Sequence, residues 1–210
     1  MVLTAATAMA QETTGRIMGA DFSDGRLTMQ VAVQIPQRLE KCVPDGFSNT
    51  EKALLLPDMD KSCGMISSPS FDFKSSIMLY AEKRELVFRK AQDKITAQPV
   101  DNGVPVETSS IILTQEQCTV IAGLFSAVVG SARDKEAPEP GEAVVAHLDG
   151  ETYLFFDKGK AGKCWSPGKN SITGQLVDVI TEISRYVRNH RPLSDELIEQ
   201  VHNLAKQFSM

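Results

Sequence analysis

The chain has 210 residues, 42% of them hydrophobic, and its 22 basic and 27 acidic residues give a formal net charge of −5. A chain of this length buries roughly 70% of its unfolded surface, so neither a metal nor a disulfide is required for folding. The negative charge argues against a protein whose whole surface follows nucleic-acid phosphates. No segment approaches the ~20 consecutive apolar residues of a membrane-spanning helix.

The first eleven residues, MVLTAATAMAQ, are uncharged and mostly small. Ala8 and Ala10 occupy the two positions that a signal peptidase reads, which predicts cleavage before Gln11. A complete signal peptide also has a basic segment and a longer apolar run. We therefore interpret residues 1–10 as a signal-peptide remnant and residues 11–210 as a single domain of a periplasmic or extracellular protein. The alternative is a disordered cytosolic N-terminus.

The first predicted elements are a strand and a short helix. Apolar residues alternate with polar or small ones from Leu27 to Ile35, which predicts a half-buried strand. Ser48 and Glu51 then form a capping-box pattern, which predicts the start of a two-turn helix. We expect that helix to end at Pro57.

The middle of the chain predicts a hairpin, a loop and a long helix. Two β-like runs at residues 77–80 and 85–89 flank charged residues and predict the hairpin. Residues 98–110 are predicted to form the loop. Thr114 and Gln117 form a second capping box, and apolar residues then recur at helical spacing.

The C-terminal part predicts a second hairpin and two more helices. Asp149-Gly150 is a tight-turn signal between residues 143–148 and 152–156. An amphipathic helix is expected after Ser171, and Ser194 is expected to cap the last helix.

These elements indicate an α+β fold with two layers. Helices would pack on one face of an antiparallel sheet built from β-hairpins, because the strand pairs are hairpins rather than helix-linked crossovers. Residues 77–131 and 143–190 share the order hairpin, loop and capped helix, which suggests two hairpin-helix units. Neither side-chain identity nor spacing establishes a duplication.

An oxidising compartment would allow two disulfides between the four cysteines, in three connectivities. Cys42 and Cys63 flank the first short helix in an irregular stretch, where a crosslink would remove much chain entropy, so we favour this bridge. Cys118 and Cys164 would then pair or stay reduced. Cys118 is equally well explained as a small buried hydrophobic residue.

Residues 158–169 contain four lysines, three glycines and the only tryptophan. They do not form the phosphate loop of nucleotide hydrolases, because Asp157 stands where its first glycine should be. A looser site for an anion or a glycan remains, since a helix N-terminus attracts negative groups. Its candidate residues are Lys160, Lys163, Trp165, Lys169 and Ser171. The alternative is a solvated loop in which Trp165 packs on the core near the following helix.

The sequence offers little support for catalysis. Cys164 among lysines could act as a nucleophile with His147 as its base, which would make the protein an exported hydrolase. The three histidines have no metal-ligand spacing with each other or with the cysteines, and no cofactor motif is present. We therefore expect a non-catalytic binding or interaction module without a metal or cofactor. Its ligand or partner could be a protein, an anion or a glycan.

Overall fold

The computed structural model describes residues 39–43, 49–93, 104–134 and 150–210. Contacts divide the chain into Met1–Gln34, which lies outside the described residues, and Ile35–Met210, which contains all of them. The predicted signal remnant and the predicted strand at Leu27–Ile35 both lie outside the described residues. Both stay predictions.

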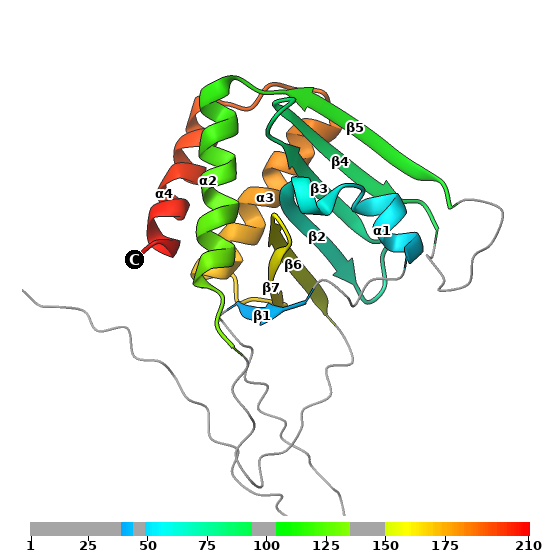
Figure 1. The fold of residues 1–210 in the computed structure, drawn as a ribbon, viewed down its shortest axis with the longest axis horizontal. Coiled ribbons are helices and arrows are strands. Elements are labelled where there is room, and N and C mark those ends of the chain that lie inside the picture. The colour runs from blue at the N-terminus through cyan, green and yellow to red at the C-terminus, as the bar shows by residue number, and fades with distance from the viewer. Residues whose placement is uncertain (1–38, 44–48, 94–103, 135–149) are drawn as a thin grey trace, which may run out of the picture. The chain divides into compact units, whose positions relative to one another are not determined.

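Seven strands form one antiparallel sheet in the order β1-β7-β6-β2-β3-β4-β5 (Figure 1). The strands are β1 (Glu40–Cys42), β2 (Cys63–Pro69), β3 (Ser75–Tyr80), β4 (Glu85–Ala91), β5 (Val106–Ile112), β6 (Glu151–Asp157) and β7 (Lys160–Trp165). The helices are α1 (Asn49–Leu55), the 3-10 turn η2 (Met59–Lys61), α2 (Gln115–Ser131), α3 (Ile172–Arg188) and α4 (Asp195–Phe208). The predicted α+β class with an antiparallel sheet is confirmed.

Helices cover both faces of the sheet, but unequally. The long helices α2, α3 and α4 pack on one face and enclose the larger core, while α1 covers part of the other face (Figure 1). Successive strand residues point to opposite faces. Met65 and Phe155 thus belong to the larger core, and their neighbours Ile66 and Phe156 pack with Leu55 of α1. The centre of the sheet is therefore buried on both sides.

The helix starts predicted at Thr114, Ser171 and Ser194 are confirmed. Thr114 Oγ1 accepts a hydrogen bond from the Gln117 amide at 3.1 Å, and Gln117 Oε1 accepts one from the Thr114 amide at 3.1 Å. The hydroxyls of Ser171 and Ser194 cap α3 and α4 by accepting from the Gly174 and Leu197 amides. These side chains satisfy amides that have no partner within their own helices.

Two further expectations are met in the first half of the chain. The hairpin predicted at residues 77–80 and 85–89 is β3 and β4, and its turn places Arg84 at φ 51°. Helix α1 ends before Pro57, as predicted. Its expected cap, Ser48, lies outside the described residues.

β6, which contains residues 152–156, pairs with β2 along one edge and with β7 along the other, which contradicts the predicted pairing of these residues with residues 143–148. Residues 143–148 and Asp149 themselves lie outside the described residues. The hairpin that forms is β6–β7, which turns at Lys158 (φ 47°) and Gly159 (φ 82°). The lysine-rich stretch is thus largely strand β7. A strand can accommodate these lysines because they lie at the turn or at solvent-exposed positions.

The loop predicted at residues 98–110 is also wrong from Val106 onward. Residues 106–112 form β5, an edge strand paired with β4. An edge strand has only one hydrogen-bonded neighbour and tolerates polar side chains, which concealed it in the sequence. Hairpin and helix do recur as β3–β4 with α2 and as β6–β7 with α3, but β5 is inserted only in the first.

We predict opposite effects for the same substitution at two glycines. A Cβ at Gly64, in the central strand β2, would lie 2.1 Å from the Ile77 carbonyl oxygen, so Gly64→Ala should lower the free energy of unfolding by about 2–3 kcal/mol. Gly123 lies on the exposed side of α2 with no atom within 4 Å of its added Cβ, so Gly123→Ala should raise it by about 0.5–1 kcal/mol. Denaturant titration measures both. A neutral Gly64→Ala would contradict the close approach of β2 and β3.

Candidate functional site

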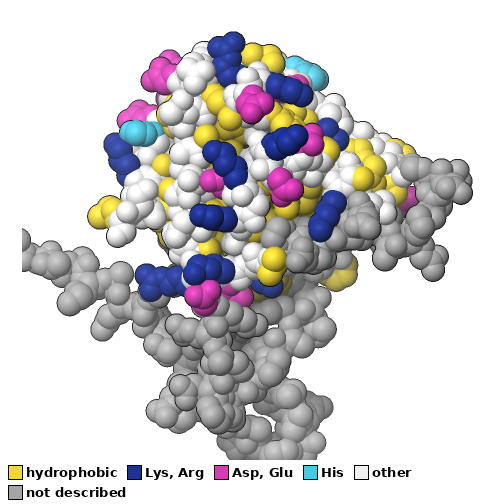
Figure 2. All heavy atoms as spheres, in the orientation of Figure 1, with side chains coloured by type: hydrophobic (Ala, Val, Ile, Leu, Met, Phe, Trp, Pro, Cys, Tyr) yellow, Lys and Arg dark blue, Asp and Glu magenta, His cyan; other side chains and the backbone are white. Residues whose placement is uncertain are grey.

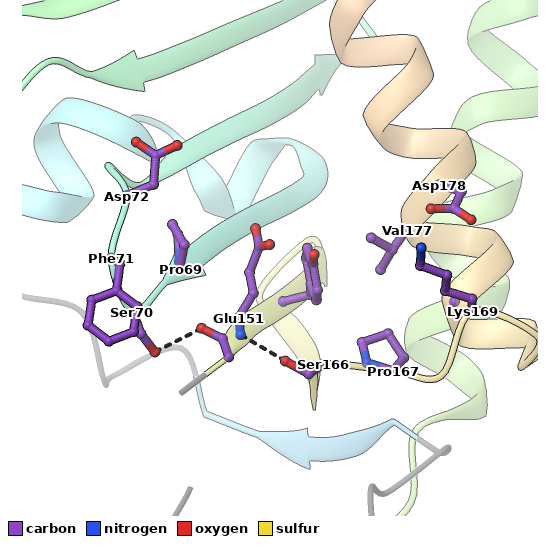
Figure 3. Close-up of a pocket in the computed structure, with 13 residues that line it drawn as sticks. Pro69, Ser70, Phe71, Asp72, Glu151, Ser166, Pro167, Lys169, Val177 and Asp178 are labelled. Carbon is purple, nitrogen blue, oxygen red and sulfur yellow. Dashed lines mark hydrogen bonds between the residues drawn. The ribbon is translucent and has the colours of Figure 1, made fainter. Parts of the chain in front are cut away.

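A hollow of about 520 Å³ opens at one end of the sheet (Figure 3). Residues 69–72 between β2 and β3 form one wall, the first residues of β6 form the floor, and the segment after β7 with the first turns of α3 closes the other side. Small-molecule sites commonly have volumes of roughly 300–1,000 Å³. The hollow is therefore large enough for a small ligand or one side chain of a partner.

Main-chain hydrogen bonds hold three of these segments together. The amide and the hydroxyl of Ser70 both donate to the Gly150 carbonyl, at 2.9 and 2.8 Å. The Glu151 amide donates to Ser166 Oγ at 2.9 Å, and the Ser166 amide donates to the Glu151 carbonyl at 2.8 Å (Figure 3). The walls are thus fixed by hydrogen bonds of backbone groups and of two serine hydroxyls.

The floor of the hollow carries a carboxylate held by two hydroxyl groups. Buried Ser67 donates a hydrogen bond to the Glu151 carboxylate. Tyr153 lies two residues further along β6, and burial together with hydrogen bonding to Glu151 raises the pKa of its phenol. The phenol therefore stays protonated as a donor. Glu151 presents a fixed negative acceptor to the hollow.

The lining carries more negative than positive groups. Its charged residues are Asp72, Glu151, Asp178 and Lys169, three carboxylates and one ammonium. Asp72 forms an ion pair with Lys90 at 2.9 Å, and hydrogen bonds from Lys90 and from the Phe73 amide lower its pKa. Asp178 and Lys169 are exposed beside the start of α3 (Figure 3). Glu151 and Asp178, which have no ion pair within the described part of the chain, thus face one lysine.

The hollow also has an apolar rim. Phe71, between β2 and β3, is 84% exposed, which is unusual for a large hydrophobic residue. Pro69, Pro167 and Val177 also line the hollow. Apolar walls around a few placed polar groups are typical of ligand sites.

The structure does not bring the five predicted site residues together. Lys169 lines the hollow, whereas the Ser171 hydroxyl is used by the Gly174 amide and the Gly168 carbonyl. Lys160 lies at the β6–β7 turn, at the opposite end of β7 from the hollow, and Lys163 is an exposed strand residue.

Trp165 does not pack toward α3 as the alternative interpretation expected. Alternation along β7 places it on the same face as Ala161, which belongs to the α1-side core. Its ring covers Gly150, where an added Cβ would lie 2.3 Å from the ring. Trp165 therefore packs behind Gly150, which itself lines the hollow.

Sequence reasoning missed the floor of the hollow. Ser67 and Glu151 are 84 positions apart, and they meet only because β2 pairs with β6. Glu151 and Tyr153 stand two apart on a strand, which gives the single local signal that they share a face. Nothing in the sequence indicated that Asp178 would join them.

The predicted Cys42–Cys63 disulfide is wrong, because all four cysteines are free thiols. Strands β7 and β6 lie between β1, which holds Cys42, and β2, which holds Cys63. Three strand spacings separate the Cα atoms by about 14 Å, whereas a disulfide requires about 7 Å or less.

Cys118 and Cys164 also lie too far apart to pair. Cys118 Sγ contacts the Ala81 carbonyl at 3.7 Å, near the end of the sheet where β2 begins. Cys164 pairs with Tyr153, whose partner on β2 is Ser67, near the other end of that strand. The disulfide argument for an oxidising compartment therefore falls away.

The structure also argues against a cysteine nucleophile. Cys164 is buried in the larger core, and burial raises the pKa of its thiol to about 12. A nucleophilic cysteine needs a lowered pKa and access to substrate. The proposed base, His147, lies outside the described residues.

The surface and the helices of the described residues add further constraints. On the face shown in Figure 2, basic and acidic side chains are interspersed. No helix among the described residues is long and apolar enough to cross a membrane. In the same part of the chain, no three His, Cys, Asp or Glu side chains gather as a metal site.

We predict that reduction leaves the intact mass unchanged and that iodoacetamide at pH 8 modifies only Cys42, which is half-buried, in the native protein. Peptide mapping after native and denatured alkylation measures this. Rapid native labelling of Cys164 would contradict its burial.

The same thiols predict an alkaline loss of stability. The pKa values of Cys63 and Cys164, about 12, exceed the ordinary 9.0, so their contribution to stability is complete below pH 9 and falls as pH rises toward 12. Each thiol should lower the free energy of unfolding by about 1.4 kcal/mol per pH unit in that window. Denaturant titration between pH 8 and 10.5 measures the loss, which should be smaller in Cys164→Ala than in the unsubstituted protein.

No protein-family model matches this sequence. No curated protein and no solved structure matches it either. Any functional argument for this chain therefore rests on the geometry of its own residues.

Proposed function

We propose that this protein is a non-catalytic binding module and that the hollow floored by Glu151 is its ligand site. The observation that carries the proposal is the Glu151 carboxylate, fixed by Ser67 and Tyr153 at the floor of a preformed hollow of about 520 Å³. A fixed acceptor loses little freedom when it binds, which favours recognition.

The lining favours binding over catalysis. Among the described residues that line it there is no histidine and no cysteine, and its tyrosine has a raised pKa, which disfavours a role as a base. The cysteine-hydrolase alternative has no support, because Cys164 is buried away from the hollow.

The charges favour a ligand with an ammonium or guanidinium group on an apolar arm. Glu151 and Asp178 would attract the cation, while Phe71, Pro167 and Val177 would contact the apolar part. A free organic amine or a lysine side chain of a partner protein would satisfy this chemistry. The anion or glycan alternative is less favoured, since Lys169 is the only basic residue among the described residues that line the hollow.

A charge series of one aromatic scaffold tests the proposal. Trp165 is the only tryptophan and covers Gly150, so its fluorescence should report occupancy. We expect benzylamine to bind at least tenfold more tightly than benzoate, with benzyl alcohol between them. Asp178→Asn should weaken benzylamine binding about three- to tenfold and leave benzyl alcohol unchanged. Glu199→Gln removes the same charge from an exposed position of α4 and serves as the control.

Two outcomes would contradict this function. Tightest binding of benzoate would favour the anion alternative, with Lys169 as its anchor. Saturable binding of none of the three compounds, monitored also by amide chemical shifts of residues 150–153, would remove the hollow as a ligand site.

Export remains part of the proposal, and it rests on residues 1–11 alone. Signal-peptidase cleavage after Ala10 should leave Gln11 as the first residue of the natively expressed protein. N-terminal sequencing of the protein from separated cell fractions measures this. Protein recovered from the cytosol with Met1 intact would contradict export.

A further inference from the structure

A second hollow, of about 250 Å³, lies on the α1 side of the sheet. Pro57 and Asp58, which follow α1, border it on one side, and strands β3, β4 and β5 contribute the rest. The side chain of buried Val87 lines it together with that of Arg89. It lies on the opposite face of the sheet from the Tyr153 side chain of the first hollow.

Arg89 is held in place by the end of α1. The last carbonyls of a helix have no partner within it, and here sheet side chains supply the donors. Arg89 Nη1 donates to the Leu54 carbonyl at 3.4 Å, and Ser76 Oγ donates to the Leu55 carbonyl at 2.6 Å. The Tyr80 hydroxyl donates to the Pro57 carbonyl at 2.9 Å. The Nη1 donor of the guanidinium therefore already has a partner.

A second donor of that guanidinium, Arg89 Nε–H, is buried and has no hydrogen-bond partner among the described residues. A buried donor without a partner is costly, and such cases usually mark a water, an ion or a ligand. A guanidinium can donate two parallel hydrogen bonds to a carboxylate, and its Nε–H is one of the donors suited to that pairing. Thr108, the cross-strand partner of Arg89, adds a hydroxyl to the lining.

The charges around this second hollow are balanced. Its lining contains two basic residues, Lys83 and Arg89, and two acidic ones, Asp58 and Glu85. A phosphate dianion would meet repulsion from both carboxylates, whereas a ligand with one charge of each sign would find a partner for both. The volume suits a small molecule rather than a peptide.

We infer that the second hollow binds a small zwitterion with a carboxylate and an ammonium group, such as a free α-amino acid. The carboxylate accepts from Arg89 Nε, with Thr108 beside it, and the ammonium group lies toward Glu85 and Asp58. This site is independent of the one in the proposed function, so either can fail alone.

The test follows the Arg89 Nε–H signal in nitrogen-15-labelled protein during titration. The probes are L-alanine, acetate and methylammonium, which carry both charges, the carboxylate alone and the ammonium alone. We expect L-alanine to shift the Arg89 Nε–H and the Ser110 amide signals saturably, with a Kd at least tenfold below that of acetate. Methylammonium should leave the Nε–H signal unmoved.

Substitutions separate this site from an unspecific effect. Arg89→Lys keeps the charge but removes the Nε–H, and it should abolish saturable binding of L-alanine. Arg185→Lys, at an exposed position of α3, is the control and should leave this binding unchanged. Because Arg89 also holds α1, Thr108→Val, at an exposed position of β5, provides a second variant that spares that contact. It should weaken binding at least threefold.

Three results would overturn the inference. An Nε–H signal that shifts linearly or not at all with L-alanine would mean that only water meets this donor. Equal affinities for acetate and L-alanine would exclude the zwitterion. Unchanged L-alanine binding in Arg89→Lys, with the fold intact by denaturant titration, would place the ligand elsewhere.

Discussion

The pairing of β2 with β6 is the interaction on which the rest of the structure depends. It joins the meander β2–β5 to the hairpin β6–β7 across an intervening helix, between residues as distant in sequence as Cys63 and Asp157. Closing so long a connection costs chain entropy, which the apolar side chains of both strands offset by burial on both faces. On the other edge of β2, strand β3 approaches Gly64 so closely that there is no room for a side chain there.

The same pairing creates the first hollow. Its register ends with Pro69 opposite Glu151, so the β2–β3 connection and the start of β6 leave the sheet side by side. One wall and the floor are therefore consequences of strand register, and only the α3 side depends on helix placement. A slip of one residue would turn Glu151 and Tyr153 to the other face and remove the carboxylate from the hollow.

Short-range sequence patterns predicted the three long helices, because helix starts and buried helix faces depend on residues close together in the chain. The capping residues Thr114, Ser171 and Ser194 and the helical spacing behind them specified α2, α3 and α4, because a cap and an amphipathic stripe act within a few residues. Lysines at the turn and at exposed positions hid β7, and polar edge residues hid β5. Of the predicted site residues only Lys169 lines the hollow, since Glu151 and Tyr153 gain their surroundings from a strand far away in sequence.

The two hollows differ in how their central charge is treated, and that difference predicts how each can bind. Glu151 is satisfied by protein donors without a ligand, so its site is preformed and a cation adds to an intact network. Arg89 instead keeps one buried donor without a protein partner, so an acceptor that enters relieves an existing cost. Both charges line a hollow beside a helix end: Glu151 opposite the first turns of α3, and Arg89 beside the end of short α1. A sheet only partly covered on each face thus places polar groups that are fixed by the fold at the borders of the two hollows.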